Sequence, residues 1–355
     1  MSQSFVLRLQ QFLLRVLYDG YKPAIWHRAW LSALEWIYRV VRVVCGHRRK
    51  VLNSKAPTPP PVLVIGNLIA GGAGKTPLVM AVCKALTDKG LKVGIVSRGY
   101  GRHHNEVMLL VPNEPLPDAK QVGDEPLYLC IHTHCPVAVA AKRAMAVNTL
   151  IETHPDLDLI VSDDGLQHHA LKRQIEWVVF DSRGQGNGRL LPAGPLREPI
   201  DRLGFVDAVI ASNTSIDELS LNLGQKPTER WHRVGVKLTG FRHALTGQWL
   251  DTEQASVQWS STSVAAFTGI ANPAKFFHSL SGNDIHAKQT IALPDHHDYA
   301  DDFCKQFSEE VLITTGKDAV KLNPPNTRLW VAEINLELPP KLIDSLEDCI
   351  GPTID

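Results

Sequence analysis

The chain has 355 residues, of which 44% are apolar and 21% are charged. This composition is that of a globular protein with room for two α/β domains, and it excludes a largely disordered chain. The six cysteines show no Cys-x-x-Cys spacing, which argues against a disulfide scaffold and indicates reduced thiols.

Although the net charge is zero, the N-terminal segment 1–50, called the basic front below, is strongly basic. Residues 1–50 contain nine Lys or Arg and two Asp or Glu, so this segment carries +7 and the remainder carries −7. From 5 to 17, apolar residues recur at three- and four-residue spacing, which predicts an amphipathic helix with a basic opposite face. The stretch 25–44 mixes tryptophans with arginines, a composition typical of the headgroup region of an anionic bilayer.

The front is too charged to span a membrane. Its longest charge-free stretch has seven residues, whereas a spanning helix needs about 20 mostly apolar ones. We therefore expect residues 1–50 to form a peripheral membrane anchor, and a signal peptide is not expected because no small-residue cleavage site follows. The alternative is a pair of helices packed on the protein's own core. Nucleic acid is not an expected partner, because no recognition motif accompanies the basic residues.

Beyond the proline-rich linker 53–61, short β-branched runs alternate with helical stretches. This alternation is typical of a parallel sheet with helices on both faces. We predict a first α/β domain within 51–227, then a hairpin linker near 228–251 and a smaller second α/β domain within 228–355. Ligands are expected at the carboxyl ends of the first domain's strands, which are predicted at 62–65, 92–96, 137–140, 157–161, 176–180 and 208–211.

Residues 71–76 read Gly-Gly-Ala-Gly-Lys-Thr and lie between an apolar run and a helix-like stretch. In this context glycines let backbone N–H groups surround phosphate oxygens, the lysine reaches the β- and γ-phosphates, and the threonine offers a hydroxyl to Mg²⁺. The usual motif has glycine where this chain has Ile69, and the alternative is an ordinary Gly-rich turn. We predict that a nucleoside triphosphate is bound by Gly71, Gly72, Ala73, Gly74, Lys75, Thr76 and Pro77.

Two acidic motifs could carry chemistry. Asp163 follows the apolar strand 157–161, at the position where such folds hold Mg²⁺. Asp124 and Glu125 lie between a glycine and a proline, which restrict the local backbone and hold the side chains. Asp124 is a candidate base and Glu125 a candidate metal contact. The alternative for each motif is a solvated surface turn.

Three further segments contain candidate site residues. Residues 294–299 combine two histidines with two carboxylates, and an Asp–His pair across a cleft would be basic enough to accept a proton at neutral pH. Segments 97–102 and 191–198 supply glycines and arginines suited to phosphate oxygens. Each segment could equally be a polar surface loop.

As an ordered set, these motifs resemble the tetraacyldisaccharide 4'-kinase family, which phosphorylates a membrane-embedded disaccharide lipid of the lipid A pathway. The resemblance covers nearly the whole chain. It rests on Gly66-Asn67 with 71–77, and on 97–101, 122–126, 163–168, 188–198, 269–273 and 295–297.

The resemblance implies ATP- and Mg²⁺-dependent transfer of the γ-phosphate to the 4'-hydroxyl of tetraacyldisaccharide 1-phosphate, giving lipid IVA. It also implies a P-loop NTPase-like α/β fold of two α/β/α sandwich domains with a hairpin linker and an N-terminal amphipathic membrane-anchoring helix. The partners would be the membrane-embedded lipid substrate and the anionic cytoplasmic face of the inner membrane, with no obligate protein partner.

The resemblance also implies roles for individual residues. Asp124 would activate the hydroxyl with help from His296, or alternatively His297, and Lys75 would hold the phosphates. The metal would be held, directly or through water, by Thr76, Glu125 and Asp163. The transferring group would contact Gln167 and His168. Candidates for contacts with substrate or nucleotide phosphates are Ser97, Arg98, Tyr100, Arg143, Asp164 and Arg197.

The chain departs from the expected family pattern at one position, and two other functions are alternatives to the kinase. Gly316 stands where the family is expected to have an acid, so no role is assigned to Lys317. A membrane-surface switch ATPase would share the phosphate loop and the basic front, but its second lysine is absent at Ala70 and it leaves 294–299 unexplained. A structural adaptor would not need Asp124 and Asp163 beside an intact phosphate loop.

Overall fold

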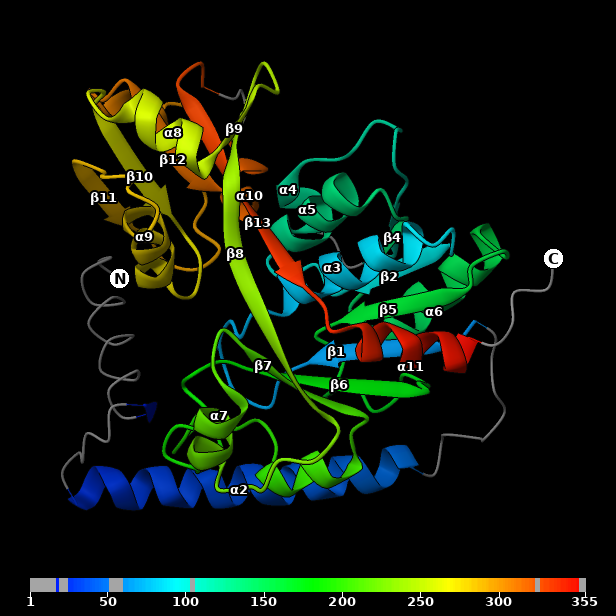
Figure 1. Cartoon of the computed structure of the whole chain (residues 1–355). Helices are drawn as coiled ribbons and strands as arrows, with labels where there is room; N and C mark the ends of the chain where they lie inside the picture. The colour runs from blue at the N-terminus through cyan, green and yellow to red at the C-terminus, as the bar shows by residue number, and fades with distance from the viewer. Residues whose placement is uncertain (1–16, 19–24, 51–59, 103–105, 323–325, 351–355) are drawn as a thin grey trace.

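The computed structural model describes residues 17–18, 25–50, 60–102, 106–322 and 326–350 (Figure 1). The predicted amphipathic segment 5–17 therefore lies outside the described residues, apart from Leu17. The first long element is α2 (Ile25–Lys50), which runs along the lower edge of the molecule in Figure 1.

The first domain is built on a mostly parallel sheet in the order β3-β4-β2-β5-β1-β6-β7. Its strands are β1 (Val62–Gly66), β2 (Val93–Ser97), β3 (Met108–Leu110), β4 (Val137–Val139), β5 (Leu159–Asp163), β6 (Ile175–Phe180) and β7 (Ala208–Ser212). The six predicted strands are confirmed to within two residues. The antiparallel edge strand β3 was not predicted, because three residues give too little alternation to stand out.

Alternating side chains of these buried strands enter two separate cores. Leu63 and Ile65 of β1 belong to the core on one face, whereas Val62 and Val64 belong to the core on the other. The first core also contains side chains of α3 (Lys75–Thr87) and α5 (Asp124–Thr133), and the second contains those of α6 (Arg143–Thr153) and α7 (Ile216–Leu223). The arrangement is the expected α/β/α sandwich. Two short helices complete this domain: α4 (Ala119–Val122) and η1 (Ile200–Phe205).

Two long strands join this sheet to the second domain. β8 (Trp231–His243) pairs in parallel with β7 through its first residues and then antiparallel with β13 (Leu329–Glu337). The described strands therefore form one continuous sheet. The predicted hairpin linker is present, since β8 turns into β9 (Trp249–Asp251).

The second domain places helices against the strands β11-β10-β12-β13. One face packs against α8 (Thr252–Trp259) and α9 (Pro273–Ser281), and the other is covered by a cluster of aromatic rings around Phe267. The remaining elements are β10 (Val264–Thr268), β11 (Gln289–Ala292), β12 (Val311–Thr315), η2 (Phe303–Gln306) and α10 (Gly316–Ala319).

The chain end does not follow the predicted domain range. Residues 228–355 were assigned to the linker and second domain, but α11 (Pro340–Ile350) places Leu342, Ile343 and Leu346 in a core of the first domain. The reason is hydrophobic burial: α11 presents an apolar face, and β13 delivers it next to α3. The first domain therefore contains the first strand, β1, and also the last described helix, α11.

Helix α2 touches the body through polar groups and leaves apolar side chains outward. Glu35 accepts hydrogen bonds from Arg189 and from the backbone N–H of Leu190, and the Tyr38 hydroxyl donates to the Arg197 carbonyl at 2.9 Å. Its exposed apolar residues are Trp30, Leu34, Trp36, Ile37, Val40, Val41 and Val43. This pattern differs from the alternative in which the helix buries its apolar side on the protein's own core.

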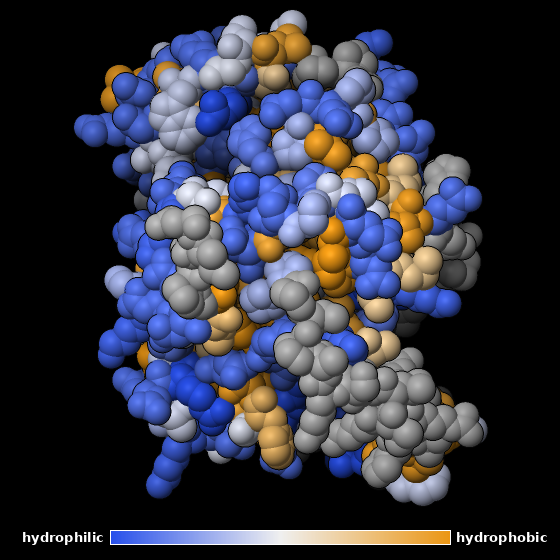
Figure 2. Space-filling model, turned by 90° about the vertical axis from the view of Figure 1, so that its right-hand side faces the viewer, coloured by the Kyte–Doolittle hydropathy of each residue, from blue (hydrophilic) through white to orange (hydrophobic). Residues whose placement is uncertain are grey.

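The described helices include none that is long and apolar enough to cross a membrane. On the face of the molecule shown in Figure 2, hydrophobic residues are interspersed with hydrophilic ones.

Candidate active site

The glycine loop lies where β1 meets α3. Gly74 adopts the left-handed conformation (φ 87°) directly before Lys75, the first residue of α3, so the sharp turn there favours glycine. The side-chain amide of Asn67 donates to the Gly71 carbonyl at 2.9 Å, and the N–H of Ala70 donates to the Pro195 carbonyl at 2.8 Å. These bonds hold the loop open at the start of the helix, where its N–H groups can meet an anion.

Lys75 pairs with a carboxylate next to the loop. Its Nζ lies 3.6 Å from Asp164, whose carboxylate also accepts two hydrogen bonds of 3.1 Å from Arg197. Burial opposes ionisation of Asp164, but the charges of Lys75 and Arg197 hold its pKa below the ordinary value. Asp164 therefore balances the two cations next to the loop.

Asp163 has a different environment. It ends β5, pairs in register with Ile65 of β1 and is 2% exposed. Burial and the nearby charge of Glu125 raise its pKa to about 7, although Lys75 acts in the opposite direction. A divalent cation held here would favour the ionised form of Asp163 and oppose the effect of its burial.

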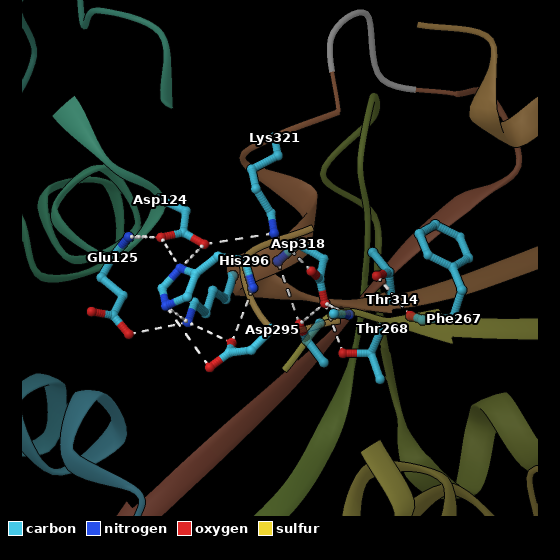
Figure 3. Close-up of polar contacts among 12 residues, drawn as sticks. Asp124, Glu125, Phe267, Thr268, Asp295, His296, Thr314, Asp318 and Lys321 are labelled. Atoms are coloured by element: carbon cyan, nitrogen blue, oxygen red, sulfur yellow. Dashed lines mark hydrogen bonds and ion pairs between the residues drawn. The ribbon is translucent and has the colours of Figure 1, made fainter. Parts of the chain in front are cut away.

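Asp124 of the first domain contacts His296 of the second domain (Figure 3). Asp124 begins α5 and is 5% exposed, and both of its carboxylate oxygens lie 3.0 Å from Nδ1 of His296. Because a carboxylate only accepts, Nδ1 is the protonated ring nitrogen. The residues are 172 positions apart in the chain, so this contact depends on the tertiary fold.

Each partner shifts the pKa of the other. Burial disfavours both charges, but the hydrogen bond from His296 and the charges of Lys317 and Lys321 lower the pKa of Asp124. The hydrogen bond to Asp124 raises the pKa of His296 above its ordinary value. It is His296 that lies against Asp124, whereas the ring of His297 packs against Tyr299 and Phe303.

Lys317 was not assigned a role from the sequence, yet it lies at the centre of this cluster. Its Nζ is 3.1 Å from Glu125, 3.2 Å from Asp295 and 3.4 Å from Nε2 of His296. Burial opposes its charge, but Glu125, Asp124 and Asp295 raise its pKa well above the ordinary value. The signal was available, because Lys317 comes shortly after the buried strand β12, and polar residues near the ends of such strands are candidate site residues.

The ring of Tyr128 occupies the space next to Gly316. A side chain at this position would lie 2.4 Å from the Tyr128 ring. The acidic side chain that the family is expected to have at this position would therefore not fit in this chain.

A cavity of about 910 Å³ opens between the two domains. The described residues that line it include most of the predicted site: Gly71, Gly72, Ala73, Gly74, Lys75, Thr76, Pro77, Ser97, Arg98, Tyr100, Glu125, Arg143, Asp163, Asp164, Gln167, Arg197 and His296. Asp124 and His168 are not in the lining. Asp124 lies behind the lining residue His296, to which it is hydrogen-bonded.

Two predicted ligand contacts, Gln167 and Arg143, also form hydrogen bonds within the protein. Gln167 donates to Glu198 at 3.0 Å and to the Asn67 carbonyl at 3.2 Å, and its amide oxygen lies 3.3 Å from Arg197. Arg143 is 3% exposed and donates to the carbonyls of Ala140 and Asp164 at 3.3 and 3.4 Å. Both side chains form part of the wall of the cavity.

The sequence and the fold both match known proteins. The family described as tetraacyldisaccharide-1-P 4'-kinase matches residues 27–351. The tetraacyldisaccharide 4'-kinase of Polaromonas naphthalenivorans is 39% identical over 88% of this chain and 89% of its own length, and that of Neisseria meningitidis is 42% identical over 82% and 83%. The chain belongs to the tetraacyldisaccharide-1-P 4'-kinase family.

A solved structure supports the same fold. The crystal structure of LpxK from Aquifex aeolicus in complex with ATP superposes with a TM-score of 0.75, at 24% identity, over 91% of this chain and 99% of that one. The resemblance to the 4'-kinase family and the P-loop NTPase-like fold are thus confirmed, and the switch ATPase is not favoured. Within a 4'-kinase, the phosphate loop, the Asp124–His296 pair and the shared cavity form one candidate active site.

Proposed function

We propose that this 4'-kinase transfers the γ-phosphate of ATP to the 4'-hydroxyl of tetraacyldisaccharide 1-phosphate at the cavity between its domains. The observation that carries the proposal is the Asp124–His296 pair, which joins α5 of the first domain to the second domain beside the phosphate loop. A kinase must position a hydroxyl, neutralise phosphate charge and offer a base. The described cavity contains groups suited to each task.

The phosphate loop would hold the nucleotide. Backbone N–H groups from Gly71 to Lys75 would surround the phosphate oxygens at the start of α3, and Lys75 would exchange Asp164 for the β- and γ-phosphates. The distance of 3.6 Å between Lys75 and Asp164 describes a weak pair, which favours this exchange.

Mg²⁺ fits the residues present. Among the residues that the structure describes, no group of three or more His, Cys, Asp or Glu is arranged for a metal ion. Mg²⁺ usually takes one or two carboxylates together with the substrate's phosphates. Asp163 has a buried oxygen without a hydrogen-bond partner and a raised pKa. Thr76, Asp163 and Glu125 would hold the ion, which when bound would neutralise phosphate charge.

The Asp124–His296 pair would receive the proton of the acceptor hydroxyl. His296 is the member that lines the cavity, and Asp124 is the buried member whose negative charge makes the pair basic. Lys317, between Glu125 and His296, would place a positive charge beside the transferring group.

The lipid acceptor suggests a location. A substrate with four acyl chains remains in the bilayer, so the enzyme must bind the membrane surface. The outward Trp30 and Trp36 are 69% and 65% exposed, and such rings favour the headgroup region. We infer that α2 lies on the cytoplasmic face of the inner membrane, with its polar side against the catalytic domain.

The decisive test is transfer of ³²P from γ-labelled ATP to tetraacyldisaccharide 1-phosphate in detergent–lipid micelles. Lys75→Ala and a lipid-free ATPase assay serve as controls. We expect labelled lipid with the wild-type chain and none with Lys75→Ala. Membrane-stimulated ATP hydrolysis that depends on Lys75 but labels no lipid would contradict the proposal.

A further inference from the structure

A fully buried carboxylate lies behind the catalytic pair. Asp318, near the start of α10, is 0% exposed. Its Oδ2 accepts hydrogen bonds from the hydroxyls of Thr268 and Thr315, both at 2.7 Å, and from the N–H of Gly269 at 3.0 Å (Figure 3). Asp318 therefore ties the ends of β10 and β12 together, at the side of the second domain that faces α5.

The other oxygen of this carboxylate holds a lysine that reaches the first domain. Lys321 has an 8% exposed side chain, and its Nζ lies 3.1 Å from Oδ1 of Asp318 and 3.6 Å from Oδ2 of Asp124. The same Nζ lies 5.1 Å from the centre of the Tyr299 ring, an attractive position for a cation. Lys321, which does not line the cavity, thus contacts the candidate base.

Asp318 also supports the histidine of the pair. The Gly269 N–H donates to Asp318, and the Gly269 carbonyl accepts from the backbone N–H of His296 at 3.2 Å. His296 has a left-handed backbone (φ 59°), a conformation that an ordinary residue adopts only where its surroundings impose it. One buried carboxylate is therefore connected to two of the groups that contact Asp124, His296 and Lys321.

We propose that Asp318 and Lys321 are positioning residues of the phosphoryl transfer, which fix the orientation of the Asp124–His296 pair from behind. This inference rests on the proposed function, since it assigns a role relative to the base of that reaction. Asp318 and Lys321 do not line the cavity, so they act through Asp124 and His296 and do not touch substrate.

Stability alone is a poor explanation for these charges. Burying a carboxylate and an ammonium costs free energy of solvation, and well-packed apolar residues of similar size are often equally stabilising. A buried cation 3.6 Å from Asp124 instead keeps the base ionised and limits the directions in which its oxygens can turn. Errors of about 1 Å in the position of a reacting group can lower a rate by about 10²-fold.

The test compares Lys321→Met and Lys321→Arg in the full chain, assayed by the ³²P transfer described above. We expect Lys321→Met to lower kcat by about 10²-fold while the KM for ATP changes by less than about twofold, and Lys321→Arg to recover most of the loss. Lys237→Met is the matched control, because Lys237 forms an exposed ion pair with Glu337 and should behave as wild type.

A second comparison separates positioning from folding. In an Asp124→Asn background, Lys321→Met should cause little further loss, because both changes act on the same group. Asp318→Asn, which keeps an acceptor oxygen but removes the charge, should lower kcat and leave the KM for ATP in place even where it lowers the melting temperature.

Two results would overturn the inference while wild-type transfer stands. One is a kcat of Lys321→Met within about threefold of wild type. The other is a loss that multiplies with that of Asp124→Asn, which would place Lys321 in another function. Absence of wild-type transfer to lipid would instead refute the proposed function itself.

Discussion

At the residue scale, the site is a balance of buried charges. Asp124, Asp163 and Glu125 lie near Lys75, Lys317 and Lys321, but the carboxylates are not equivalent. Three cationic partners lower the pKa of Asp124, whereas burial and Glu125 raise that of Asp163. Environments that separate the pKa values of neighbouring acids also separate their roles. Here one is suited to a base that stays ionised and the other to a cation site.

Asp124→Asn keeps the size of the side chain and removes its charge. We expect turnover to fall by about 10²- to 10⁴-fold, the range usual for acid–base catalysis, with little change in ATP affinity. Single-turnover phosphate transfer and equilibrium nucleotide binding measure the two quantities. Asp344→Asn, at an exposed position of α11, is the control. Near-normal turnover of Asp124→Asn would exclude the base role.

The His296–Asp124 contact also predicts a pH dependence of stability. The folded-state pKa of His296 is raised above its ordinary value of 6.5, so its stabilisation is fully present below pH 6.5 and is lost as pH rises through the folded value. Urea unfolding of wild type and His296→Gln between about pH 5.5 and 9 tests this. The difference in unfolding free energy should shrink as pH rises; a constant or growing difference would contradict the prediction.

At the element scale, the position of Asp124 depends on how two backbones meet. Gly123 adopts φ 96° before α5, and a Cβ there would lie 2.9 Å from Cα of Gly99. A Cβ on Gly99 would in turn lie 2.5 Å from the Val122 carbonyl oxygen. These glycines therefore allow the loop after β2 to contact the start of α5, which brings Tyr100 to within 5.0 Å of the His296 ring.

Gly123→Ala should disturb this contact. The positive φ and the close approach to Gly99 both oppose a side chain, so we expect a loss of about 1 kcal/mol or more in stability together with reduced turnover. Gly90→Ala is the matched control, because Gly90 also has a positive φ (85°) but has open space around it. If both variants have the same kcat per folded enzyme, the Gly123–Gly99 contact does not position the site.

The sequence was sufficient to predict six strands of the first domain and the motifs at their ends. Buried parallel strands such as 157–161 have a strong apolar signal, and Asp163 follows directly. The contact between Asp124 and His296, and the choice of His296 over His297, could not be derived from local pattern, because they depend on how the domains pack. Lys321 was missed because a lysine three residues after Asp318 is indistinguishable in sequence from an exposed helical pair.

Helix α2 carries a prediction of its own. Replacing Trp30 and Trp36 together by glutamine removes two exposed rings and should weaken binding to anionic vesicles several-fold, because such binding scales with the apolar area buried in the interface. Vesicle sedimentation and lipid-free ATP binding distinguish a membrane effect from damage to the site. Trp249→Gln, an exposed tryptophan on β9, should leave vesicle binding unchanged. Equal partition of all three proteins would refute a membrane role for α2.

At the scale of the whole molecule, the two domains share one sheet. β8 and β13 pass from one domain to the other, and α11 returns the chain to the first core. Each domain therefore contributes to folding of the other, although their cores are distinct. This connection also fixes the spacing across the cavity, where Asp124 from one domain must meet His296 from the other.

The return of α11 predicts that a change at the chain end destabilises both domains. Leu346 is 0% exposed and lies in the first core, so Leu346→Ala should cost about 2 to 5 kcal/mol. Because the sheet is continuous, calorimetry should show one transition that moves to lower temperature as a whole, and nucleotide binding and second-domain structure should be lost together. Ser345→Ala, on an exposed part of the same helix, provides the control. If instead two transitions are resolved and only one moves with Leu346→Ala, the domains fold independently, and the geometry of the Asp124–His296 contact must be set by ligand binding and not by the shared sheet.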